Sequence, residues 1–518
     1  MCGILFTNNN NISEISFRNS LELLNHRGPD ATGYLKYKNN LFGHKRLKIL
    51  DIDDRSNQPF YSKDERYIII FNGEIYNYLE LAKRFNIKMI TNCDTELIVE
   101  LFALIGSKCV TLLEGMFSFL IYDTLVNDFF IARDHLGVKP LYISEMNGTV
   151  IISSEISPIL NLTNTFSIDP IGIRQYIKLR TFFNNRTIYK EISFFPAGYF
   201  YENSKLIKYW DLPVDNNINE PSDSDLRNMV IESINKRLIS DVPVGSFLSG
   251  GIDSSIIASL SKKPDTWTIG FEDNNEFSYA QIVANKIGSN HHEVIIDKKE
   301  FIDLAKHMIH IRKEPLSVPN EVLIYKMSNE AKKSNTVILC GEGADELFYG
   351  YDRIYAWAYR NKNFNIKEFS DYYSYSKNND IEIVEDAIQP YLHLNNSLKI
   401  VSHFFQMSHL HGLLRRVDNA TMLASIEARV PFVDNIFLVE TLIGQSYEYK
   451  NLNGIIKSPL KRIFSDILPL EIINRKKVGF PVPLDIIFES NENHMDKWFD
   501  FNLKTLFGND FNLNDIKI

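Results

Sequence analysis

The 518-residue chain has few cysteines, no excess of cationic residues and no long apolar run. Its four cysteines are Cys2, Cys93, Cys109 and Cys340. They lie far apart without a Cys-x-x-Cys pair, which argues against a disulfide framework and a zinc site. The net charge of −9 argues against general nucleic-acid binding. No apolar run approaches the roughly 20 residues of a membrane span, and no basic segment followed by an apolar one marks a signal peptide. We therefore expect a cytoplasmic protein with reduced thiols and no membrane or nucleic-acid partner.

The composition is that of an ordinary globular protein, with 44% hydrophobic and 23% charged residues. The length is too great for a single hydrophobic core, so we expect two or three domains.

The most informative segment is 249–255, which reads Ser-Gly-Gly-Ile-Asp-Ser-Ser. A short apolar run precedes it and apolar residues at helical spacing follow, so the pattern predicts a strand, a tight turn and a helix. Backbone N–H groups at such a turn bind anions, and the glycines allow a phosphate to approach closely. Asp253 suits this place only if it holds a cation, most simply Mg²⁺. No Gly-Lys-Ser/Thr string occurs, so this is not a Walker A loop. It resembles the pyrophosphate-binding loop of the ATP pyrophosphatases, which split ATP between its α and β phosphates.

The chain opens with Met1, Cys2 and Gly3. If an aminopeptidase removes Met1, Cys2 carries a free α-amine beside its own thiol. One residue then supplies both the nucleophile and the general base. The alternative is a start methionine followed by a buried cysteine without a catalytic role.

Other strings in the first half favour a catalytic Cys2. Asn72 and Gly73 follow a predicted buried strand and can donate a side-chain and a backbone N–H to an oxyanion. Asp94 can receive a substrate ammonium. A hairpin turn at Asn-Gly and a helix cap at Asp94 are the structural alternatives. With the string His-Arg-Gly-Pro-Asp at 26–30, these features resemble the class II glutamine amidotransferases over about residues 2–205.

This resemblance implies Cys2 as nucleophile and Asn72 and Gly73 as oxyanion hole. It implies that Arg46, Glu74 and Asp94 anchor glutamine, with Arg46 binding the α-carboxylate through two hydrogen bonds. It also implies an αββα sandwich, in agreement with short apolar runs separated by turns and predicted helices at 16–24 and 94–106. We place this glutaminase domain at 2–212 and a polar linker at 213–225.

From residue 226 the pattern changes to alternating strands and helices. We predict strands at 244–248, 266–271, 291–296 and 336–340, and helices at 254–263, 278–287, 301–311 and 322–333. This alternation is typical of a parallel sheet with helices on both faces, which binds ligands beyond the carboxyl ends of its strands. The pair His291-His292 points to opposite faces of a strand, which disfavours a metal site.

A second polar turn, Gly-Glu-Gly-Ala-Asp at 341–345, follows the predicted strand at 336–340. It shares the sheet edge with the first loop, so Asp253 and Asp345 would hold Mg²⁺ together. Glu342 would face the acceptor carboxylate or deprotonate attacking ammonia. Cations of the helical last third would neutralise departing pyrophosphate, although each taken singly is equally well a solvated helix charge. They are Arg415, Arg416, Arg429, Lys457, Lys461, Arg475, Lys476 and Lys477.

The strings from about 226 to 483 resemble the synthetase domain of glutamine-dependent asparagine synthetases. The resemblance implies an α/β domain of the ATP-pyrophosphatase type with a helical extension, which we place at 226–518. It implies Glu342 and Lys457 as catalytic residues, with Lys457 facing pyrophosphate. The implied ATP contacts are Leu248, Ser249, Gly250, Gly251, Asp253, Ser254, Ser255 and Gly341, and the implied metal ligands are Asp253 and Asp345.

The family transfers nitrogen from glutamine to aspartate through a β-aspartyl-adenylate, with ATP and Mg²⁺ as cofactors and ammonia passing through an internal tunnel. We also expect a homodimer. Two residues depart from the family: Cys340 replaces the usual Ser, and Lys313 replaces an Asp often found before Glu-Pro. The second departure lies near the acceptor in the family. The same chemistry on another carboxylate, such as a uronic acid of a surface polysaccharide or a secondary-metabolite acid, therefore stays open.

Two further alternatives belong to other classes of protein. The complete set of site residues argues against a non-catalytic scaffold protein. The intact loop at 249–255 argues against a stand-alone glutaminase.

Overall fold

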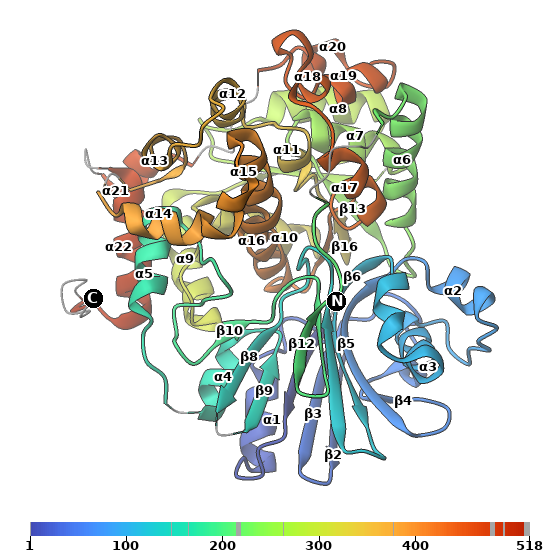
Figure 1. Cartoon of the computed structure of the whole chain (residues 1–518). Helices are drawn as coiled ribbons and strands as arrows, with labels where there is room; N and C mark the ends of the chain where they lie inside the picture. Colours follow the sequence, from blue (N-terminus) through green and yellow to red (C-terminus); the bar gives the residue numbers. More distant parts are fainter. Residues whose placement is uncertain are drawn as a thin grey trace.

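The computed structural model describes residues 2–146, 148–163, 165–213, 219–262, 264–376, 378–476, 482–489 and 493–511. Met1 and Lys477, both named in the sequence predictions, lie outside these ranges. The chain forms two halves, one above the other in Figure 1, and the chain start lies where they meet. In the described residues, no helix combines the length and the apolar character needed to cross a membrane.

The lower half contains two antiparallel sheets of six strands each. Their strand orders are β10-β8-β9-β1-β3-β2 and β12-β11-β7-β6-β5-β4. The strands are β1 (Cys2–Thr7), β2 (Ala31–Tyr37), β3 (Asn40–Arg46), β4 (Phe60–Tyr61), β5 (Tyr67–Ile75), β6 (Gly115–Asp123), β7 (Asp128–Arg133), β8 (Tyr142–Met146), β9 (Thr149–Ser153), β10 (Ser193–Phe194), β11 (Tyr199–Glu202) and β12 (Lys205–Lys208). Helices α1 (Glu14–Glu22) and α4 (Ile156–Thr163) pack on the first sheet, and α2 (Tyr78–Arg84) and α3 (Asp94–Ile105) accompany the second.

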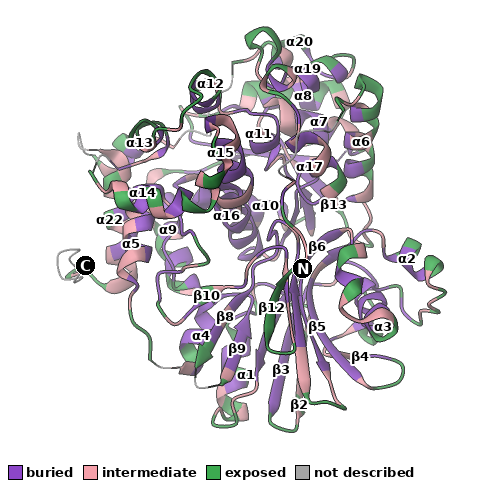
Figure 2. Cartoon of the chain, in the orientation of Figure 1, coloured by how far each residue is buried: buried purple, intermediate pink, exposed green. Residues whose placement is uncertain are grey.

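Alternation along the strands explains the four layers. On β1, Ile4 and Phe6 point into the apolar core between the two sheets, whereas Leu5 points to the core under α1. On β5, Ile70 belongs to the core between the sheets and Phe71 to the core under α3. Each sheet therefore buries both faces, and Figure 2 shows the strands mostly in the colour of buried residues. The predicted αββα sandwich is confirmed.

The upper half is built on five parallel strands in the order β15-β14-β13-β16-β17. They are β13 (Val244–Phe247), β14 (Asp265–Gly270), β15 (Asn290–Ile295), β16 (Val337–Leu339) and β17 (Glu427–Arg429). Helices α6 (Asp223–Lys236), α7 (Ile252–Leu260), α8 (Phe277–Ile287), α9 (Lys298–Arg312) and α10 (Asn320–Ala331) surround this sheet. The predicted parallel α/β architecture is confirmed. Strand β17 was not predicted, because its three residues, Glu-Ala-Arg, include two charged side chains and form no apolar run.

A helical extension completes the upper half. It comprises α11 (Ala344–Leu347), α12 (Asp352–Arg360), α13 (Ile366–Tyr373), α14 (Ile381–Ile388), α15 (Ser397–His403), α16 (Leu410–Met422), α17 (Ile436–Ile443), α18 (Tyr447–Lys450), α19 (Ser458–Ile463), α20 (Leu470–Ile473), α21 (Leu484–Phe488) and α22 (His494–Phe507). A π-helical turn, η4 (Phe404–His409), joins α15 to α16. Such turns are rare and occur frequently at functional sites.

The adjacent histidines of β15 have structural environments. The His291 ring lies 2.9 Å from Thr266 Oγ1, and the His292 ring stacks on Trp267 with centroids 4.0 Å apart. Both rings therefore contact residues of the neighbouring strand β14.

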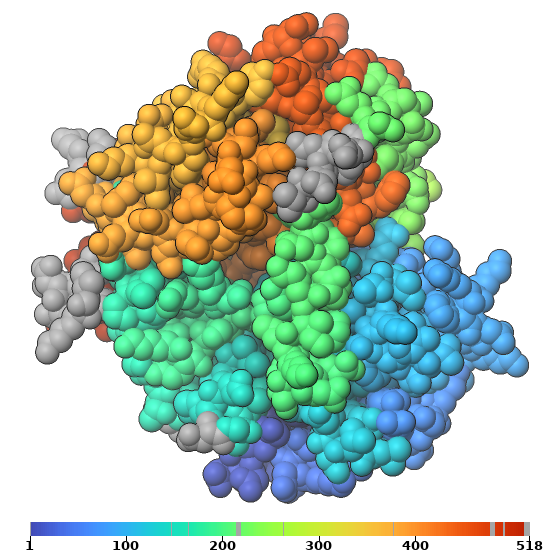
Figure 3. All heavy atoms as spheres, viewed as in Figure 1, coloured from blue at the N-terminus to red at the C-terminus, as the bar shows by residue number. Residues whose placement is uncertain are grey.

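Polar contacts and connecting segments fix the two halves to each other. Arg27 pairs with Asp418 of α16 at 2.9 Å, and the Trp210 indole donates to Glu440 of α17 at 2.8 Å. In the space-filling view the β11–β12 hairpin lies on the front of the lower half and leads toward the upper one (Figure 3). Helix α5 (Pro170–Leu179) of the first half also rises beside the upper half (Figure 1).

Candidate functional site

The polar residues predicted for glutamine hydrolysis gather at one end of the space between the two lower sheets. Ile4 packs between the sheets, so Cys2, two positions earlier on β1, faces the same way. Ile70 does the same on β5, so Asn72 and Glu74 also face this space. The strand period therefore brings together three residues that are distant in sequence.

Asn72 holds the backbone of Cys2 and retains a donor without a partner among the described residues. The Cys2 backbone nitrogen donates to Asn72 Oδ1 at 2.9 Å. The Nδ2 of Asn72 is buried and has no hydrogen-bond partner among the described residues. Buried polar groups are rarely left without a partner, so this amide is suited to a polar ligand. At Gly73 a Cβ would lie 2.2 Å from Met116 O, so the strand packing itself requires glycine.

The Cys2 thiol is a free, buried thiol. Burial raises its pKa, so it is protonated at neutral pH and needs a base before it can attack a substrate. Its carbonyl oxygen accepts from Arg27 Nε at 3.1 Å. The sequence assigns the base to the α-amine of Cys2 itself, which requires removal of Met1.

Two buried carboxylates, Glu74 and Asp94, stand near this thiol. Burial raises the pKa of Glu74 well above its usual value and that of Asp94 to about 6. Glu74 Oε1 has no hydrogen-bond partner among the described residues, while Asp94 Oδ2 accepts from Ile75 N at 2.9 Å. A substrate ammonium would satisfy the buried oxygen and neutralise the charge.

Arg46 has the place that the sequence predicts but is occupied by other contacts. It pairs with Cys2 across β1 and β3. Its terminal nitrogens donate to the carbonyls of Leu50, Asp51 and Asp53 and to Asn57 Oδ1. Two hydrogen bonds to a glutamine carboxylate would require some of these contacts to be exchanged.

A cavity of about 1670 Å³ opens in the upper half beside the 249–255 loop. The loop is shaped by its own polar groups: Ser254 Oγ accepts from Ser249 N at 3.2 Å and donates to Gly251 O at 3.2 Å. Gly250 has φ +67°, and a Cβ there would lie 2.5 Å from Tyr279 Cβ, so no larger residue fits. A Cβ on Gly341 would lie 3.0 Å from Asp253 Cβ, so the second polar turn packs directly on the first.

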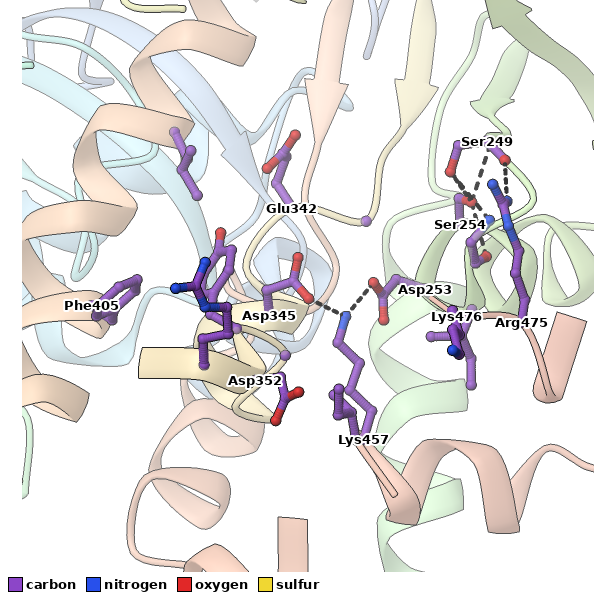
Figure 4. A pocket seen from close by; sticks show the side chains of 18 of the residues that line it. Ser249, Asp253, Ser254, Glu342, Asp345, Asp352, Phe405, Lys457, Arg475 and Lys476 are labelled. Atoms are coloured by element: carbon purple, nitrogen blue, oxygen red, sulfur yellow. Dashed lines mark hydrogen bonds and ion pairs between the residues drawn. The ribbon is translucent and has the colours of Figure 1, made fainter. Parts of the chain in front are cut away.

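The two predicted metal ligands flank one lysine (Figure 4). Lys457 Nζ lies 2.5 Å from Asp253 Oδ2 and 2.6 Å from Asp345 Oδ1. Despite burial, these carboxylates raise the pKa of Lys457, so the ammonium stays charged. A Cβ at Gly350 would lie 2.0 Å from Asp345 Oδ1, so glycine is needed for this arrangement.

This arrangement tests whether Mg²⁺ fits. The described residues contain no group of three or more His, Cys, Asp or Glu side chains placed to hold a metal. Mg²⁺ in nucleotide sites commonly takes one or two carboxylates together with phosphate oxygens. Asp253 and Asp345 supply two carboxylates with a cation, the Lys457 ammonium, already between them. The donor set therefore fits Mg²⁺ bound together with a nucleotide.

Glu342 belongs to a second charged group in the cavity. It accepts from Arg416 Nη2 at 2.9 Å, and Arg416 Nη1 lies 3.3 Å from Asn320 Oδ1. Glu342 comes from the turn after β16, Arg416 from α16 and Asn320 from α10. Three elements thus bring polar groups together around Glu342, which the sequence analysis expects to face the acceptor carboxylate.

Most, but not all, of the predicted nucleotide-site residues line the cavity. Those that do are Ser249, Gly251, Asp253, Ser254, Gly341, Glu342, Asp345 and Lys457. Leu248, Gly250 and Ser255 belong to the same loop but are not among its described lining residues. Leu248 packs in a small apolar core, and Ser255 Oγ donates to Gly251 O at 2.7 Å. These residues therefore stabilise the loop on the side that faces away from the cavity.

The predicted pyrophosphate cations divide into two groups. Arg416, Lys457, Lys461, Arg475 and Lys476 line the cavity. Arg429 does not, and its Nη2 instead lies 3.4 Å from Glu74 Oε2, so the expectation is wrong for Arg429. Arg415 packs over the ring of Phe182 and does not line the cavity either. Both arginines are buried. Arg429 belongs to the short strand β17, and Arg415 contacts a residue far away in the sequence, so periodicity could not predict where either side chain lies.

Sequence reasoning also missed residues at both sites. Glu427 and Arg429 of β17 reach the Cys2 site, and Arg429 Nε donates to Glu427 Oε1 at 2.6 Å. Arg180 of the lower half lines the upper cavity. Arg429 was among the cations that the sequence analysis named, but nothing in the local sequence indicates which site Glu427 and Arg429 face.

Residues 225–504 match the family model for asparagine synthase, and residues 1–210 match that for a glutamine amidotransferase domain. An asparagine synthetase (glutamine-hydrolysing) of Bacillus subtilis is 31% identical, with 92% of this chain and 85% of the relative aligned. The chain belongs to the asparagine synthetase family.

Other relatives of this asparagine synthetase family member come from distant organisms. An Arabidopsis thaliana asparagine synthetase is 31% identical over 93% of this chain and 78% of its own length. A putative asparagine synthetase of Methanocaldococcus jannaschii is 34% identical over 63% of this chain and 71% of its own. A glutamine phosphoribosylpyrophosphate amidotransferase structure from B. subtilis aligns with 51% of this chain and 65% of that chain, with 15% identity and a TM-score of 0.30. The family assignment does not depend on so weak a structural match.

Proposed function

We propose that this chain is a glutamine-hydrolysing asparagine synthetase, which makes asparagine from aspartate, glutamine and ATP. Its family domains make it an ATP-dependent ligase with glutamine as nitrogen donor. The observation that carries the proposal is the position of Arg429. Its side chain meets Glu74 at the Cys2 site, and its carbonyl accepts from Cys340 N at 3.0 Å, next to the Gly341 turn. One residue thus contacts both sites.

In the first half-reaction the Cys2 thiolate attacks the amide carbon of glutamine. Asn72 Nδ2 and the Gly73 N–H stabilise the oxyanion, and Glu74 and Asp94 hold the substrate ammonium. The Cys2 α-amine takes the thiol proton and returns it to the departing ammonia. Water then hydrolyses the thioester to glutamate.

In the second half-reaction a carboxylate oxygen of the acceptor attacks the α-phosphorus of ATP, and pyrophosphate leaves. Lys457 stabilises the charge that develops on pyrophosphate, with the 249–255 loop around the phosphates. Ammonia then attacks the acyl-adenylate carbon, Glu342 accepts a proton, and AMP leaves. Asp253 and Asp345 would hold Mg²⁺, which supplies charge neutralisation on the phosphates when bound.

The test is an acceptor screen with purified protein, glutamine and Mg-ATP, read by pyrophosphate release and product mass. Aspartate should give asparagine, AMP and pyrophosphate in equal amounts. Amides formed from uronic or other acids, without asparagine, would replace aspartate with the alternative acceptor. The large cavity is the observation that favours this alternative. The homodimer, the cytoplasmic location, the ammonia tunnel and the domain boundaries remain predictions from the sequence.

A further inference from the structure

The cavity extends well beyond the phosphate-binding loop. Its volume of about 1670 Å³ exceeds the roughly 300–1,000 Å³ typical of a site for one small ligand. In Figure 4, Ser249 lies at one end of the cavity and Phe405 at the other. The Phe405 end has aromatic walls: Phe405 and His409 belong to η4, with ring centroids 4.6 Å apart, and Tyr373 and Tyr375 lie beside them.

A cation from the other half of the chain enters this aromatic end. Arg180 follows helix α5 directly and adopts a left-handed backbone with φ 63°. That conformation costs an ordinary residue free energy, and Gly or Asn usually fills it. The next residue fixes the position: a Cβ on Gly412 of α16 would lie 2.9 Å from Thr181 Oγ1, and Arg415 Nη2 donates to the same oxygen at 3.1 Å. The backbone is thus held where the Arg180 side chain reaches the cavity.

Arg180 contacts a tyrosine and a histidine, whereas two other arginines nearby contact carboxylates. Its guanidinium donates to Tyr375 Oη and lies 3.2 Å from His409 Nε2 and 4.5 Å from the centre of the Tyr375 ring. It forms no ion pair with any Asp or Glu of the described residues. Arg416 in the same cavity pairs with Glu342, and Arg174 on the same helix pairs with Asp380.

No carboxylate of the described residues contacts the Arg180 guanidinium directly. The groups around it are Tyr351, Tyr373, Tyr375, His409 and, at longer range, Glu346. His409 stands between, with Nε2 3.7 Å from Glu346 Oε1. A half-buried guanidinium that faces a cavity and has no carboxylate in direct contact can take an anion as its partner.

We propose that Arg180 binds a second anionic group of the acceptor, apart from the carboxylate that becomes the amide. The acceptor is then a carboxylate that carries a further carboxylate or a phosphate, with its body against the aromatic end. For aspartate the second group is the α-carboxylate, and for a sugar acid it is a phosphate on the sugar. The inference rests on the proposed amidotransfer and names a specificity residue for it. It also makes the upper site incomplete without the lower half of the chain.

The test compares matched acceptors that differ in the second anion. Aspartate is paired with β-alanine, and galacturonic acid 1-phosphate with galacturonic acid. Wild-type protein should use the doubly charged member of one pair with a KM lower by roughly 30-fold or more. Arg180→Gln should abolish this preference while leaving the KM values for ATP and glutamine unchanged, and Arg180→Lys should restore part of it. Arg174→Gln, which alters the same helix outside the cavity, should behave as wild type.

A binding measurement separates failure of this inference from failure of the proposed function. If no acceptor supports pyrophosphate release, the proposed function fails, and the four compounds are titrated directly by calorimetry with ATP present. Tighter binding of a doubly charged member, lost in Arg180→Gln, still supports the role of Arg180. Wild-type protein without such a preference in either turnover or binding, or Arg180→Gln that keeps it, overturns the inference.

Discussion

The Cys2 site and the cavity beside the 249–255 loop differ in whether their polar groups have partners within the protein. Around Cys2, the buried Asn72 Nδ2 and Glu74 Oε1 lack hydrogen-bond partners among the described residues. In the cavity, charged groups around the loop pair with one another, as Lys457 does with Asp253 and Asp345, and Arg180 at the aromatic end is an exception. The first site is enclosed between sheets, whereas the second is open and large.

This difference indicates how each site meets its ligand. Unpaired buried groups are costly, and a small ligand that satisfies them gains binding free energy without reorganisation. Paired charges have to exchange partners when phosphates and Mg²⁺ arrive. We therefore expect little rearrangement at the Cys2 site apart from the exchange of contacts at Arg46, and a larger rearrangement in the cavity.

The largest expected effect comes from removing the Cys2 thiol, which should abolish the activity of one site and leave that of the other. Cys2→Ala should reduce glutamine hydrolysis by roughly 10⁴-fold or more, because no other group at this site can form the thioester. Ammonia-dependent pyrophosphate release should be retained, since the cavity does not use the thiol. Cys340→Ser, which substitutes another buried thiol, should keep glutaminase activity. Residual hydrolysis at the wild-type rate in Cys2→Ala would remove Cys2 from the mechanism.

The complementary change is made in the cavity. Asp253→Asn and Asp345→Asn should each slow pyrophosphate release by about 100- to 1,000-fold, with glutamine or with ammonia, because charge neutralisation on the phosphates is lost. Glutamine hydrolysis without acceptor should continue. Asp352→Asn, at an exposed position on the same cavity, is the matched control. Near-normal release in both variants would exclude these carboxylates as metal ligands.

Local pattern was enough to predict the frame of both sites. Cys2 and Asn72 were predicted from motifs, with Asn72 after the end of a strand, whereas β5 continues through Asn72 to Ile75. The strand–turn–helix pattern around 249–255 is found as β13, the loop and α7. The second turn was placed because parallel strands end at the same sheet edge, and Gly341 indeed packs against Asp253.

The rest depends on contacts between segments far apart in sequence. Arg429 was expected at the pyrophosphate because it is a cation near the cavity in sequence, but β17 turns its side chain toward Glu74. Arg180 carries no local signal, because its role comes from the packing of Thr181 on Gly412 across the two halves. Long-range packing of this kind is invisible to periodicity.

A pH profile sharpens the contrast at the Cys2 site. Burial raises the pKa of Asp94 to about 6, and the ionised form is the one that can receive an ammonium. The kcat/KM for glutamine hydrolysis should therefore fall about tenfold per pH unit below 6, as protons compete with substrate. In Asp94→Asn the value should be low throughout, and its fall below pH 6 should be shallower than in wild type, because only protonation of the Cys2 α-amine remains. A wild-type profile flat between pH 5 and 7 would contradict the role of Asp94.

The smallest expected effect concerns stability on the cavity side. Burial, with the neighbouring Asp345, raises the pKa of Glu346 from 4.5 to about 7, so the folded protein binds this proton more tightly than the unfolded chain. The free energy of unfolding should therefore fall as pH rises from about 4.5 to 7, with the loss complete above 7. Glu346→Gln stays neutral and can still accept from Tyr351 Oη, which lies 2.6 Å from Glu346 Oε1. Relative to wild type it should gain about 1–3 kcal/mol at pH 8 and little at pH 5, measured by denaturant unfolding. The exposed Asp371→Asn should show no such dependence, and a gain of equal size at both pH values would mean that the charge of Glu346 is not the cause.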